Sequence, residues 1–360
     1  MSGSWRTVRD RSRPAPARRW AGAVLVALTV LAGAVLAGGP VRADDDLIGT
    51  PPFDVMFTHP EDTLPDIAVS HRIGYTELRL ANPTVDPWLP APGSLVLLPT
   101  AHVLPAGDRR GILINLADQR LYFFPPKGGA PQSFPLGIGT EGADVRVGRT
   151  TVKGKRVAPT WTPTASMRVE NPDLPVSIPP GDDNPLGPMA LDLAWTAIAI
   201  HGTVKPYGVG RRVSHGCFRL FNEDITTLFA QVPVGTPVQV VDQPVKLGWH
   251  QGGLYLEVHP TIAQAEEIEN TGRFTPIDDG AEVKAQVART VAERAGAARV
   301  DEVDWDLVEK AVGERNGLPV RILAPGDAPA PGAASDSPVS NAPVPEVPSP
   351  DPDSNAAAFR

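Results

Sequence analysis

Short runs of alternating apolar and polar residues recur between residues 108 and 242, and turn residues bound most of them. This period of two predicts strands. The clearest case is Gly111–Leu116 followed by Leu121–Phe124, which the Ala117-Asp118-Gln119 turn joins into a hairpin. The pattern therefore predicts a β-rich domain. Its further strands are expected at residues 133–138, 189–195, 197–200 and 235–241.

Other stretches of this domain depart from the simple alternation. Residues 148–161 carry four basic residues in a segment that has the look of a second hairpin. Residues 162–188 are rich in proline and glycine and show little periodicity, so we expect a long loop that lies over the site as a lid. After Leu220 the pattern changes to that of a short helix, with Asn222 as its N-cap.

Smaller sets of elements flank this domain on both sides. Residues 44–105 predict the order strand, helix, helix, strand, with Thr63 as the N-cap of the first helix and Asn82-Pro83 ending the second. Residues 243–323 begin with a hairpin through His250–Gly253. Two helices, at residues 281–294 and 304–315, should follow it, each with an apolar face. The chain is thus expected to be multidomain.

The two ends of the chain are expected to lie outside these folded parts. In residues 1–43, six arginines precede the apolar run Ala21–Ala37, and Val41-Arg42-Ala43 offers a small-residue cleavage site. The run has 17 residues, which is short for a membrane span, so a cleavable export signal is predicted and an uncleaved anchor is the alternative. Residues 324–360, rich in proline, alanine and serine, predict a disordered tail.

The net charge and the cysteine content argue against several classes of partner and cofactor. The net charge is −8, and residues 1–43 hold seven arginines and one aspartate, so the remaining chain carries −14. Such an acidic chain argues against nucleic acid as a partner. A single cysteine cannot form an internal disulfide, and the scattered histidines show no metal-ligand spacing. We therefore expect no metal and no other cofactor.

The single cysteine lies in a stretch that combines several reactive residue types. A thiol attacks as thiolate, so it needs a base or a positive charge beside it. His215 precedes Cys217 by two residues and His201 precedes it by 16. Gly202 and Gly216 directly follow the two histidines, where the backbone must pack closely or expose its N–H groups. The alternative interpretation is a buried structural cysteine with incidental histidines.

The pattern His201-Gly-Thr followed by Ser214-His-Gly-Cys-Phe-Arg-Leu resembles the active-site signature of the L,D-transpeptidases, bacterial cysteine acyltransferases that act on peptidoglycan. Gly111-Ile-Leu-Ile-Asn-Leu, Arg120-Leu-Tyr-Phe-Phe and Gly148-Arg-Thr-Thr also resemble their catalytic domain. The resemblance implies a catalytic sandwich or barrel over residues 108–242 with short helices.

The flanking segments show resemblances of their own. Residues 44–105, with the phrases Glu61-Asp-Thr-Leu and Ala81-Asn-Pro, resemble a lysin-motif (LysM) module, which binds glycan in other proteins. A small packing domain that binds nothing is the alternative for this segment. Residues 243–323 resemble the C-terminal accessory module of the longer periplasmic family members. The resemblance therefore implies a periplasmic protein.

The family resemblance also implies roles for individual residues. Cys217 would attack a peptide carbonyl and form a thioester. His201 and His215 compete for the base role; the resemblance supports His201, with the Gly202 carbonyl orienting its imidazole. His215 and the N–H groups of Gly216 and Cys217 would then form the oxyanion hole. A thiolate paired with histidine should persist well below the usual thiol pKa of ~8.5.

Ser214 and Arg219 are the candidate substrate-binding residues. Arg219 either forms a salt bridge at the edge of the core or holds a substrate carboxylate in bidentate geometry. The residues alone leave both roles open.

By resemblance, the donor is a tetrapeptide stem of peptidoglycan, cut between its third residue and a terminal D-alanine. The acceptor is a second stem (a 3–3 cross-link), a lysine of a protein such as an outer-membrane lipoprotein, a free D-amino acid, or water. With water the same site is an L,D-carboxypeptidase. A non-catalytic protein that binds the cell wall through residues 44–105 is the alternative from another class.

Overall fold

The protein is described here from a computed structural model that covers residues 45–49, 51, 53–126, 128–139, 146–214 and 216–326. The expected export signal at residues 1–43 lies outside these residues, as does the expected tail beyond residue 326. Among the described helices, none combines the length and the apolar character that crossing a membrane requires.

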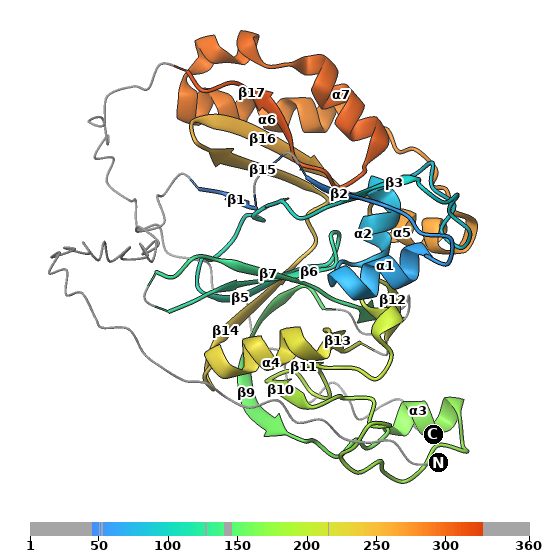
Figure 1. Ribbon diagram of the computed structural model, residues 1–360. Helices are drawn as coiled ribbons and strands as arrows, with labels where there is room; N and C mark the ends of the chain where they lie inside the picture. Colours follow the sequence, from blue (N-terminus) through green and yellow to red (C-terminus); the bar gives the residue numbers. More distant parts are fainter. Residues whose placement is uncertain are drawn as a thin grey trace, which may run out of the picture. The chain divides into compact units, whose positions relative to one another are not determined.

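A curled sheet of eight strands forms the centre of the catalytic segment (Figure 1). Its order is β13-β11-β10-β9-β14-β5-β6-β7. Most neighbours are antiparallel, but β14 runs parallel to β5 and β11 runs parallel to β13. The strands are β5 (Gly111–Asn115), β6 (Arg120–Phe124), β7 (Gln132–Pro135), β9 (Gly148–Val157), β10 (Met189–Leu193), β11 (Ala199–His201), β13 (Phe218–Arg219) and β14 (Pro237–Val241). The expected hairpin of β5 and β6 is confirmed.

The prediction of a hairpin at residues 148–161 was wrong. This segment forms one strand of ten residues, β9, which pairs with β10 on one side and with β14 on the other. Gly154 lies inside the strand opposite Asp192, without the positive φ that a turn would need. Pairing with β14 over residues 148–151 and with β10 over residues 152–157 stabilises an extended chain here, so local turn signals did not decide the structure.

Two short helices belong to the catalytic segment. The segment predicted to be a loop contains α3 (Ala165–Glu170), capped by Thr164. Helix α4 (Asn222–Gln231) begins where it was expected, but Asn222 is its first residue and Phe221 is the N-cap. The Asn222 side chain instead accepts a hydrogen bond of 2.9 Å from the Thr203 amide. Asn222 thus binds a residue distant in the sequence and does not act as the N-cap that the sequence indicated.

The N-terminal segment has the expected order of elements. Strand β2 (Asp54–Phe57) pairs with β3 (Leu95–Leu98), and α1 (Leu64–His71) and α2 (Tyr75–Ala81) lie between them in the chain. The Thr63 side chain caps α1 by accepting from the Asp66 amide, as predicted. Two further short strands, β1 (Leu47–Ile48) and β4 (His102–Val103), pair with each other.

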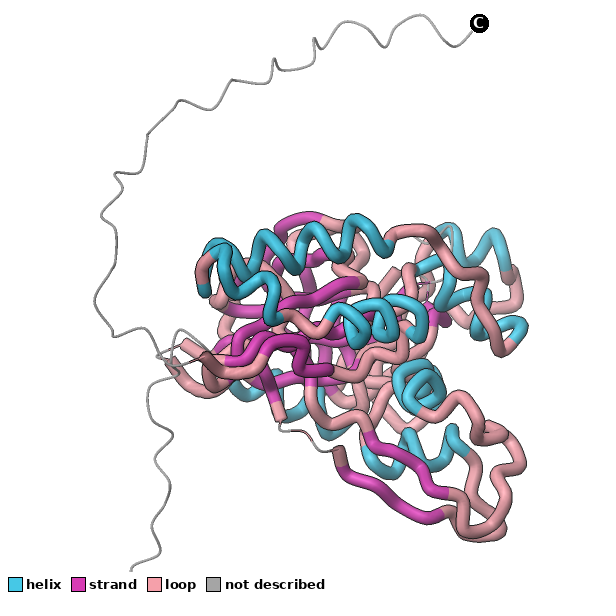
Figure 2. The backbone as a smooth tube through the Cα atoms, turned by 90° about the horizontal axis from the view of Figure 1, so that it is seen from above, coloured by secondary structure: helices cyan, strands magenta, loops and turns pink. Residues whose placement is uncertain are grey.

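The C-terminal segment is a three-stranded sheet with helices (Figures 1 and 2). The expected hairpin is β15 (Val245–His250) and β16 (Gly253–Val258), and β17 (Val320–Leu323) adds a strand that periodicity did not reveal. The two expected helices are α6 (Gly280–Ala295) and α7 (Trp305–Glu314), and α5 (Ile262–Thr271) is an additional one. Val283, Val287 and Val291 are the buried face of α6.

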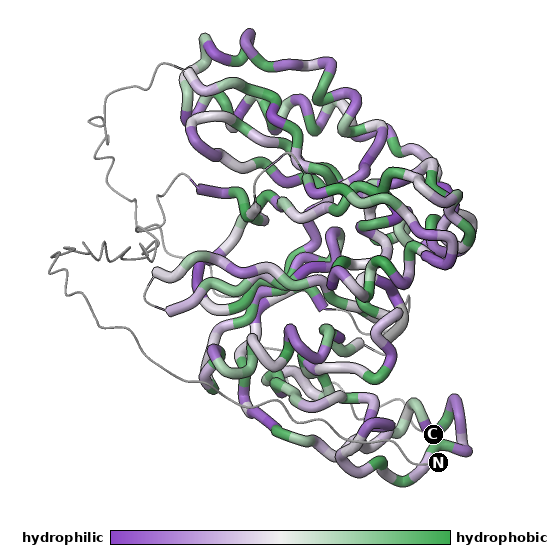
Figure 3. The backbone as a smooth tube through the Cα atoms, in the orientation of Figure 1, coloured by the Kyte–Doolittle hydropathy of each residue, from purple (hydrophilic) through white to green (hydrophobic). Residues whose placement is uncertain are grey.

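Burial of apolar side chains follows the strands. One cluster takes Ile112, Phe123, Val152, Leu191 and Phe218 from five strands of the large sheet, and α4 covers it with Ile225 and Leu228. In Figure 3 the central strands carry green, hydrophobic stretches, whereas the tube of α6 and α7 alternates between hydrophobic and hydrophilic positions. Burying apolar surface of this kind is the main term that favours folding.

A buried network of ionised side chains accompanies these apolar cores. The Lys246 ammonium lies 2.7 Å from Asp118 Oδ2 and 2.7 Å from Glu257 Oε1, and all three side chains are fully buried. Burial raises the pKa of Asp118, but the Lys246 ammonium, further neighbouring charge and the hydrogen bonds from Lys246 and Tyr122 together outweigh burial, so the pKa is lowered. His259 Nε2 lies 2.6 Å from the same Glu257 oxygen. Asp118, Glu257 and His259 are metal-ligand types, but Lys246 already supplies the cation between the two carboxylates.

The network continues into the N-terminal segment. Arg120 donates to Glu77 of α2 at 2.7 Å, and His102 Nε2 lies 3.4 Å from the other oxygen of Glu77. The Val103 amide donates to Glu257. Residues from all three expected domains therefore share one buried set of ionic hydrogen bonds.

Removing the central ammonium should destabilise the whole folded part. Lys246→Ala would leave Asp118 and Glu257 buried without a counter-charge, which costs about 3–5 kcal/mol in comparable buried pairs. Urea unfolding followed by circular dichroism should show this loss. Lys310→Ala is the matched control, because Lys310 pairs with Glu314 at 3.8 Å on the exposed surface of α7. A similar small change in both variants would contradict a central role for Lys246.

Candidate active site

Two neighbouring parallel strands bring the candidate base and nucleophile to one cavity. His201 is the last residue of β11, and Cys217 directly precedes β13. The register pairs Ile200 with Phe218 and His201 with Arg219, and the Leu220 amide donates to the His201 carbonyl at 2.9 Å. The 15 residues between His201 and Cys217 thus leave β11 and return to pair beside it.

His201 and Cys217 line one cavity of about 460 Å³. The segment expected to be a lid forms one wall of this cavity. Two backbone hydrogen bonds between Trp161 and Ile178 hold this segment in place. The buried Asn184 also holds it, because its side chain donates to the Pro159 carbonyl at 2.7 Å. The wall residues from this segment are Thr162, Thr164, Met167, Pro185 and Leu186, and Trp161 directly before it also lines the cavity.

The imidazole of His201 is buried and held by the backbone. Its Nδ1 lies 2.6 Å from the Gly202 carbonyl oxygen. Because a carbonyl only accepts, Nδ1 carries the proton and Nε2 keeps its basic lone pair. Burial lowers the pKa of His201 to about 4, although the Gly202 hydrogen bond acts in the opposite direction. The side chain is therefore a neutral base at neutral pH.

Cys217 is partly exposed to the cavity, with Sγ 3.6 Å from the Ala197 carbonyl oxygen. Burial raises the pKa of its thiol, and the Ala199 amide and the charges of Arg219 and Arg156 only reduce this rise. Both members of the pair are therefore neutral at rest. This differs from the resting thiolate that the sequence suggested, because the closed cavity disfavours each charged form.

The two glycines of the motif occupy positions that suit no other residue. A Cβ on Gly202 would lie 2.5 Å from Asn222 Oδ1, so the backbone can pass the start of α4 only without a side chain. Gly216 is buried and has a φ of 104°, which side chains rarely permit. These features fit the close packing that was expected for both positions.

The structure places the remaining candidates, Arg219, Ser214 and His215, to different extents. Arg219 lines the cavity beside Cys217, and none of the described carboxylates forms an ion pair with it. The alternative of a salt bridge at the core edge is thus not seen in the described part of the chain. The backbone of Ser214 belongs to β12 (Arg212–Ser214), which pairs with β8 (Ile138–Gly139). His215 lies outside the described residues, so its predicted oxyanion role stays a prediction.

Several residues that line the cavity were not among the candidates from the sequence, and two of them form an ion pair. Arg156 of β9 and Asp192 of β10 line the cavity with Cys217 and His201. They lie 36 residues apart in the chain, and Arg156 was assigned to a basic hairpin, so only the pairing of the two strands brings them together.

Comparison with known proteins agrees with this geometry. The model of the L,D-transpeptidase catalytic domain (YkuD) matches residues 109–240. The chain is 39% identical over 261 residues to the probable L,D-transpeptidase YbiS of Escherichia coli (strain K12), covering 71% of this chain and 81% of that protein. It is 38% identical over 270 residues to the probable L,D-transpeptidase ErfK/SrfK of the same strain, with coverages of 73% and 83%.

The chain belongs to the L,D-transpeptidase family. Solved structures with similarity include the catalytic domain of the Enterococcus faecium L,D-transpeptidase, at 23% identity and a TM-score of 0.29, covering 36% of this chain and 95% of that one. An L,D-transpeptidase from Mycobacterium tuberculosis H37Rv matches at 17% identity and a TM-score of 0.29, covering 43% and 71%. The family match and the curated relatives identify the protein as a transferase with an L,D-transpeptidase catalytic domain.

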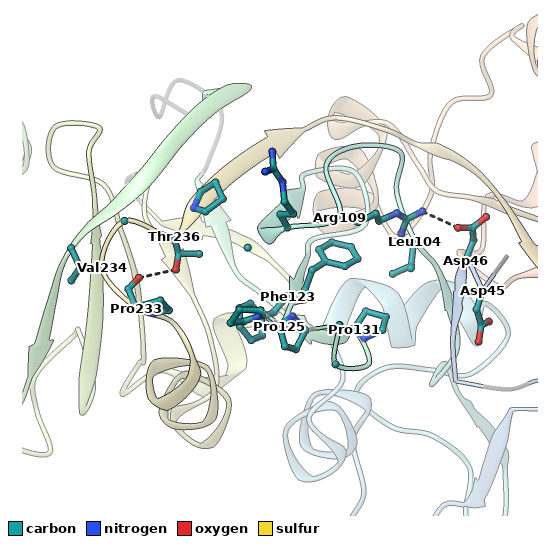
Figure 4. Close-up of a pocket in the computed structure, with 18 residues that line it drawn as sticks. Asp45, Asp46, Leu104, Arg109, Phe123, Pro125, Pro131, Pro233, Val234 and Thr236 are labelled. Carbon is teal, nitrogen blue, oxygen red and sulfur yellow. Dashed lines mark hydrogen bonds and ion pairs between the residues drawn. The ribbon is translucent and has the colours of Figure 1, made fainter. Parts of the chain in front are cut away.

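A larger cavity of this L,D-transpeptidase, of about 1000 Å³, is a different site (Figure 4). Prolines such as Pro125, Pro131 and Pro233 line it together with Arg109, which pairs with Asp46 at 3.0 Å. The residues that line it include neither cysteine nor histidine. It therefore lacks the chemistry for acyl transfer, and the smaller cavity at Cys217 is the candidate active site.

The low pKa of His201 predicts an unusual pH profile. The folded pKa of about 4 lies below the ordinary 6.5, so the base stays available as the pH falls through the usual histidine range. The rate at which a carbapenem acylates Cys217 should be level from neutral pH to about pH 5 and should fall only towards pH 4. Mass spectrometry of timed samples would measure it, with circular dichroism at each pH as the folding control. A decline centred near pH 6.5 would contradict the burial effect.

Proposed function

We propose that this L,D-transpeptidase transfers the acyl group of a peptidoglycan tetrapeptide stem to an amine acceptor, through a thioester on Cys217. One observation carries the proposal: β11 and β13 deliver His201 and Cys217 to one cavity, with Nδ1 of His201 tied to the Gly202 carbonyl. This arrangement provides a nucleophile and an oriented neutral base, as cysteine acyl transfer requires.

The first half of the reaction cuts the donor. His201 Nε2 takes the thiol proton as Cys217 Sγ attacks the carbonyl carbon of the donor's third residue. The C–N bond to the terminal D-alanine then breaks, and the imidazolium returns the proton to the leaving amine. Because burial disfavours both resting charges, the proton is transferred during the attack and not before it.

The second half moves the acyl group to the acceptor. A neutral amine attacks the thioester carbonyl, the C–S bond breaks, and the amine proton passes through His201 to the thiolate. We propose Arg219 as a partner for a substrate carboxylate, since it lines both the catalytic cavity and an adjoining hollow of about 320 Å³. Two hollows that meet at Arg219 suit a reaction with two substrates.

The proposal extends to the cellular setting. We propose that residues 1–43 direct export to the periplasm and that the acceptor is a second stem or a lysine of an outer-membrane lipoprotein. The β2-α1-α2-β3 segment would act as a LysM-like glycan-binding domain; its exposed Phe57 and Trp88 offer surfaces on which sugar rings can stack. Residues 243–323 would serve as the accessory module that supports the catalytic domain through Lys246.

Incubation with purified muropeptides tests the activity. We expect release of D-alanine together with dimers joined between the third residues of two stems, both identified by mass spectrometry. Cys217→Ser should lower the rate by several orders of magnitude while keeping the melting temperature, because it removes the nucleophile alone. Shortened monomers without dimers would indicate a carboxypeptidase. A Cys217→Ser variant as active as the wild type would exclude the thioester route.

N-terminal sequencing of the exported protein tests its location. The cleavage pattern Val41-Arg42-Ala43 predicts a mature chain that begins at about Asp44, recovered from the periplasmic fraction. An Ala43→Arg variant, which spoils the small residue at the cleavage position, should accumulate as the longer form. Recovery of the intact leader on the wild-type protein in the membrane fraction would indicate an anchor instead.

A further inference from the structure

The cavity of about 1000 Å³ has no part in the mechanism described above, and it shares no lining residue with the catalytic cavity. Most of its wall comes from the start of β5, the end of β6 with the turn after it, and the loop between α4 and β14. Figure 4 shows Pro233 at one end, Arg109 and Asp46 at the other, and Pro125 and Pro131 between them. This elongated arrangement suits an extended peptide.

The wall is mostly apolar. Phe124 and Leu104 line it together with five prolines, which are Pro125, Pro126, Pro131, Pro233 and Pro237. A peptide that packs on such a wall buries some of its own backbone N–H groups, and each of these costs free energy if it finds no acceptor. A proline-rich segment has few N–H groups, and its polyproline II conformation is largely formed before binding. The wall therefore favours a segment of this composition.

The charged residues of the wall leave one cation open. Asp45 lies 2.5 Å from His250 Nδ1, and Asp46 pairs with Arg109 at 3.0 Å. The Arg109 guanidinium also lies over the ring of Phe124, at 5.5 Å from its centroid. Arg110 is exposed and lines the cavity, and none of the carboxylates in the described part of the chain forms an ion pair with it. An acidic group in the cavity would find its partner there.

The described chain ends close to this cavity. After β17 it continues to Pro325, and a Cβ on Gly252 would lie 3.4 Å from the Cβ of Pro325. Gly252 belongs to the turn between β15 and β16, and His250 in the same hairpin holds Asp45 of the cavity wall. The residues that follow Gly326 therefore start one short chain of contacts away from the cavity.

Residues 343–352 have the composition that this wall favours. They read Pro-Val-Pro-Glu-Val-Pro-Ser-Pro-Asp-Pro and hold five prolines in ten residues. With three residues per turn of polyproline II, Val344, Val347 and Pro350 share one apolar face, and Glu346 lies on another. Residues 327–342 precede this segment, and 16 flexible residues span about 20–24 Å on average.

We propose that the cavity binds residues 343–352 of the same chain, in an extended polyproline II conformation. Val344, Val347 and Pro350 would pack on the proline-lined wall, and Glu346 would pair with Arg110. Residues 327–360 carry five carboxylate side chains and one arginine, so their net charge also suits an open cation. A segment that is expected to be disordered by itself would thus order on this wall. The catalytic cavity would stay open to its substrates.

Disulfide trapping in the full chain, with Cys217→Ser as background, tests the proposal. Val234→Cys places a thiol at the cavity, where Val234 is 59% exposed, and Val347→Cys places one on the proposed contact face. Under mild oxidation the pair should form a disulfide at least about tenfold faster than Val55→Cys with Val347→Cys, because docking raises the effective concentration. Val55 is the matched control, 53% exposed on β2 and outside the cavity. Mass spectrometry of timed digests measures both rates.

Charge exchange tests the ionic contact. Arg110→Glu should slow the trapping of Val234→Cys with Val347→Cys about two- to fivefold, as expected for the loss of a partly exposed ion pair. Adding Glu346→Arg should restore the rate. Arg289→Glu is the control and should change nothing, since Arg289 is exposed on α6 and lies outside the cavity. Both arginines are exposed, so the melting temperature should stay the same in each variant.

Three results would overturn the proposal. The first is an equal trapping rate for the two cysteine pairs, which would mean that the segment has no preference for the cavity. The second is a slower rate in Arg110→Glu that Glu346→Arg fails to relieve. The third is a disulfide that joins two chains and disappears on dilution, because the segment would then bind a second copy. All three readouts are independent of acyl transfer, so they leave the test of the proposed function unaffected.

Discussion

The buried ammonium of Lys246 is the interaction on which the rest of the described structure depends. It compensates Asp118 of the catalytic sheet and Glu257 of the C-terminal sheet at the same distance of 2.7 Å. Without it, two fully buried carboxylates would lack the ammonium between them, and a buried charge without a counter-charge carries a large desolvation cost. Through Arg120 and Glu77 the same network reaches α2. The three segments therefore share one ionic framework.

Within this framework, the pairing of β11 and β13 decides where the chemistry occurs. A parallel pair requires a crossover, and the chain uses residues 202–217 for it. The crossover begins with Gly202, which packs against Asn222, and ends with Gly216 at a positive φ. The side chains of His201 and Cys217 thus share a cavity because the register of one short strand pair is fixed.

Burial then sets the electrostatics of the cavity. It keeps the imidazole of His201 and the thiol of Cys217 neutral, while the Gly202 carbonyl fixes the proton on Nδ1. The charged groups at the cavity wall are Lys153, Arg219 and the ion pair of Arg156 with Asp192, and no described carboxylate forms an ion pair with Arg219. The cavity thus combines a neutral nucleophile and base with charged side chains that can contact charged substrate groups.

The sequence by itself determined the reactive residues, the family and most elements with strong periodicity. A lone cysteine with two histidines and two glycines is a local pattern, and hairpins such as Gly111–Phe124 and helix starts such as Thr63 depend on neighbours in the chain. Only the tertiary structure decided the rest. Strand β9 is extended because it pairs with two neighbouring strands. The Asn222 side chain accepts a hydrogen bond from the Thr203 amide and does not cap its helix. Arg156 and Asp192 form an ion pair because they lie on paired strands. The neutrality of the catalytic pair and the Lys246 network also required the fold, since burial and long-range charge pairs leave no periodic trace in a sequence.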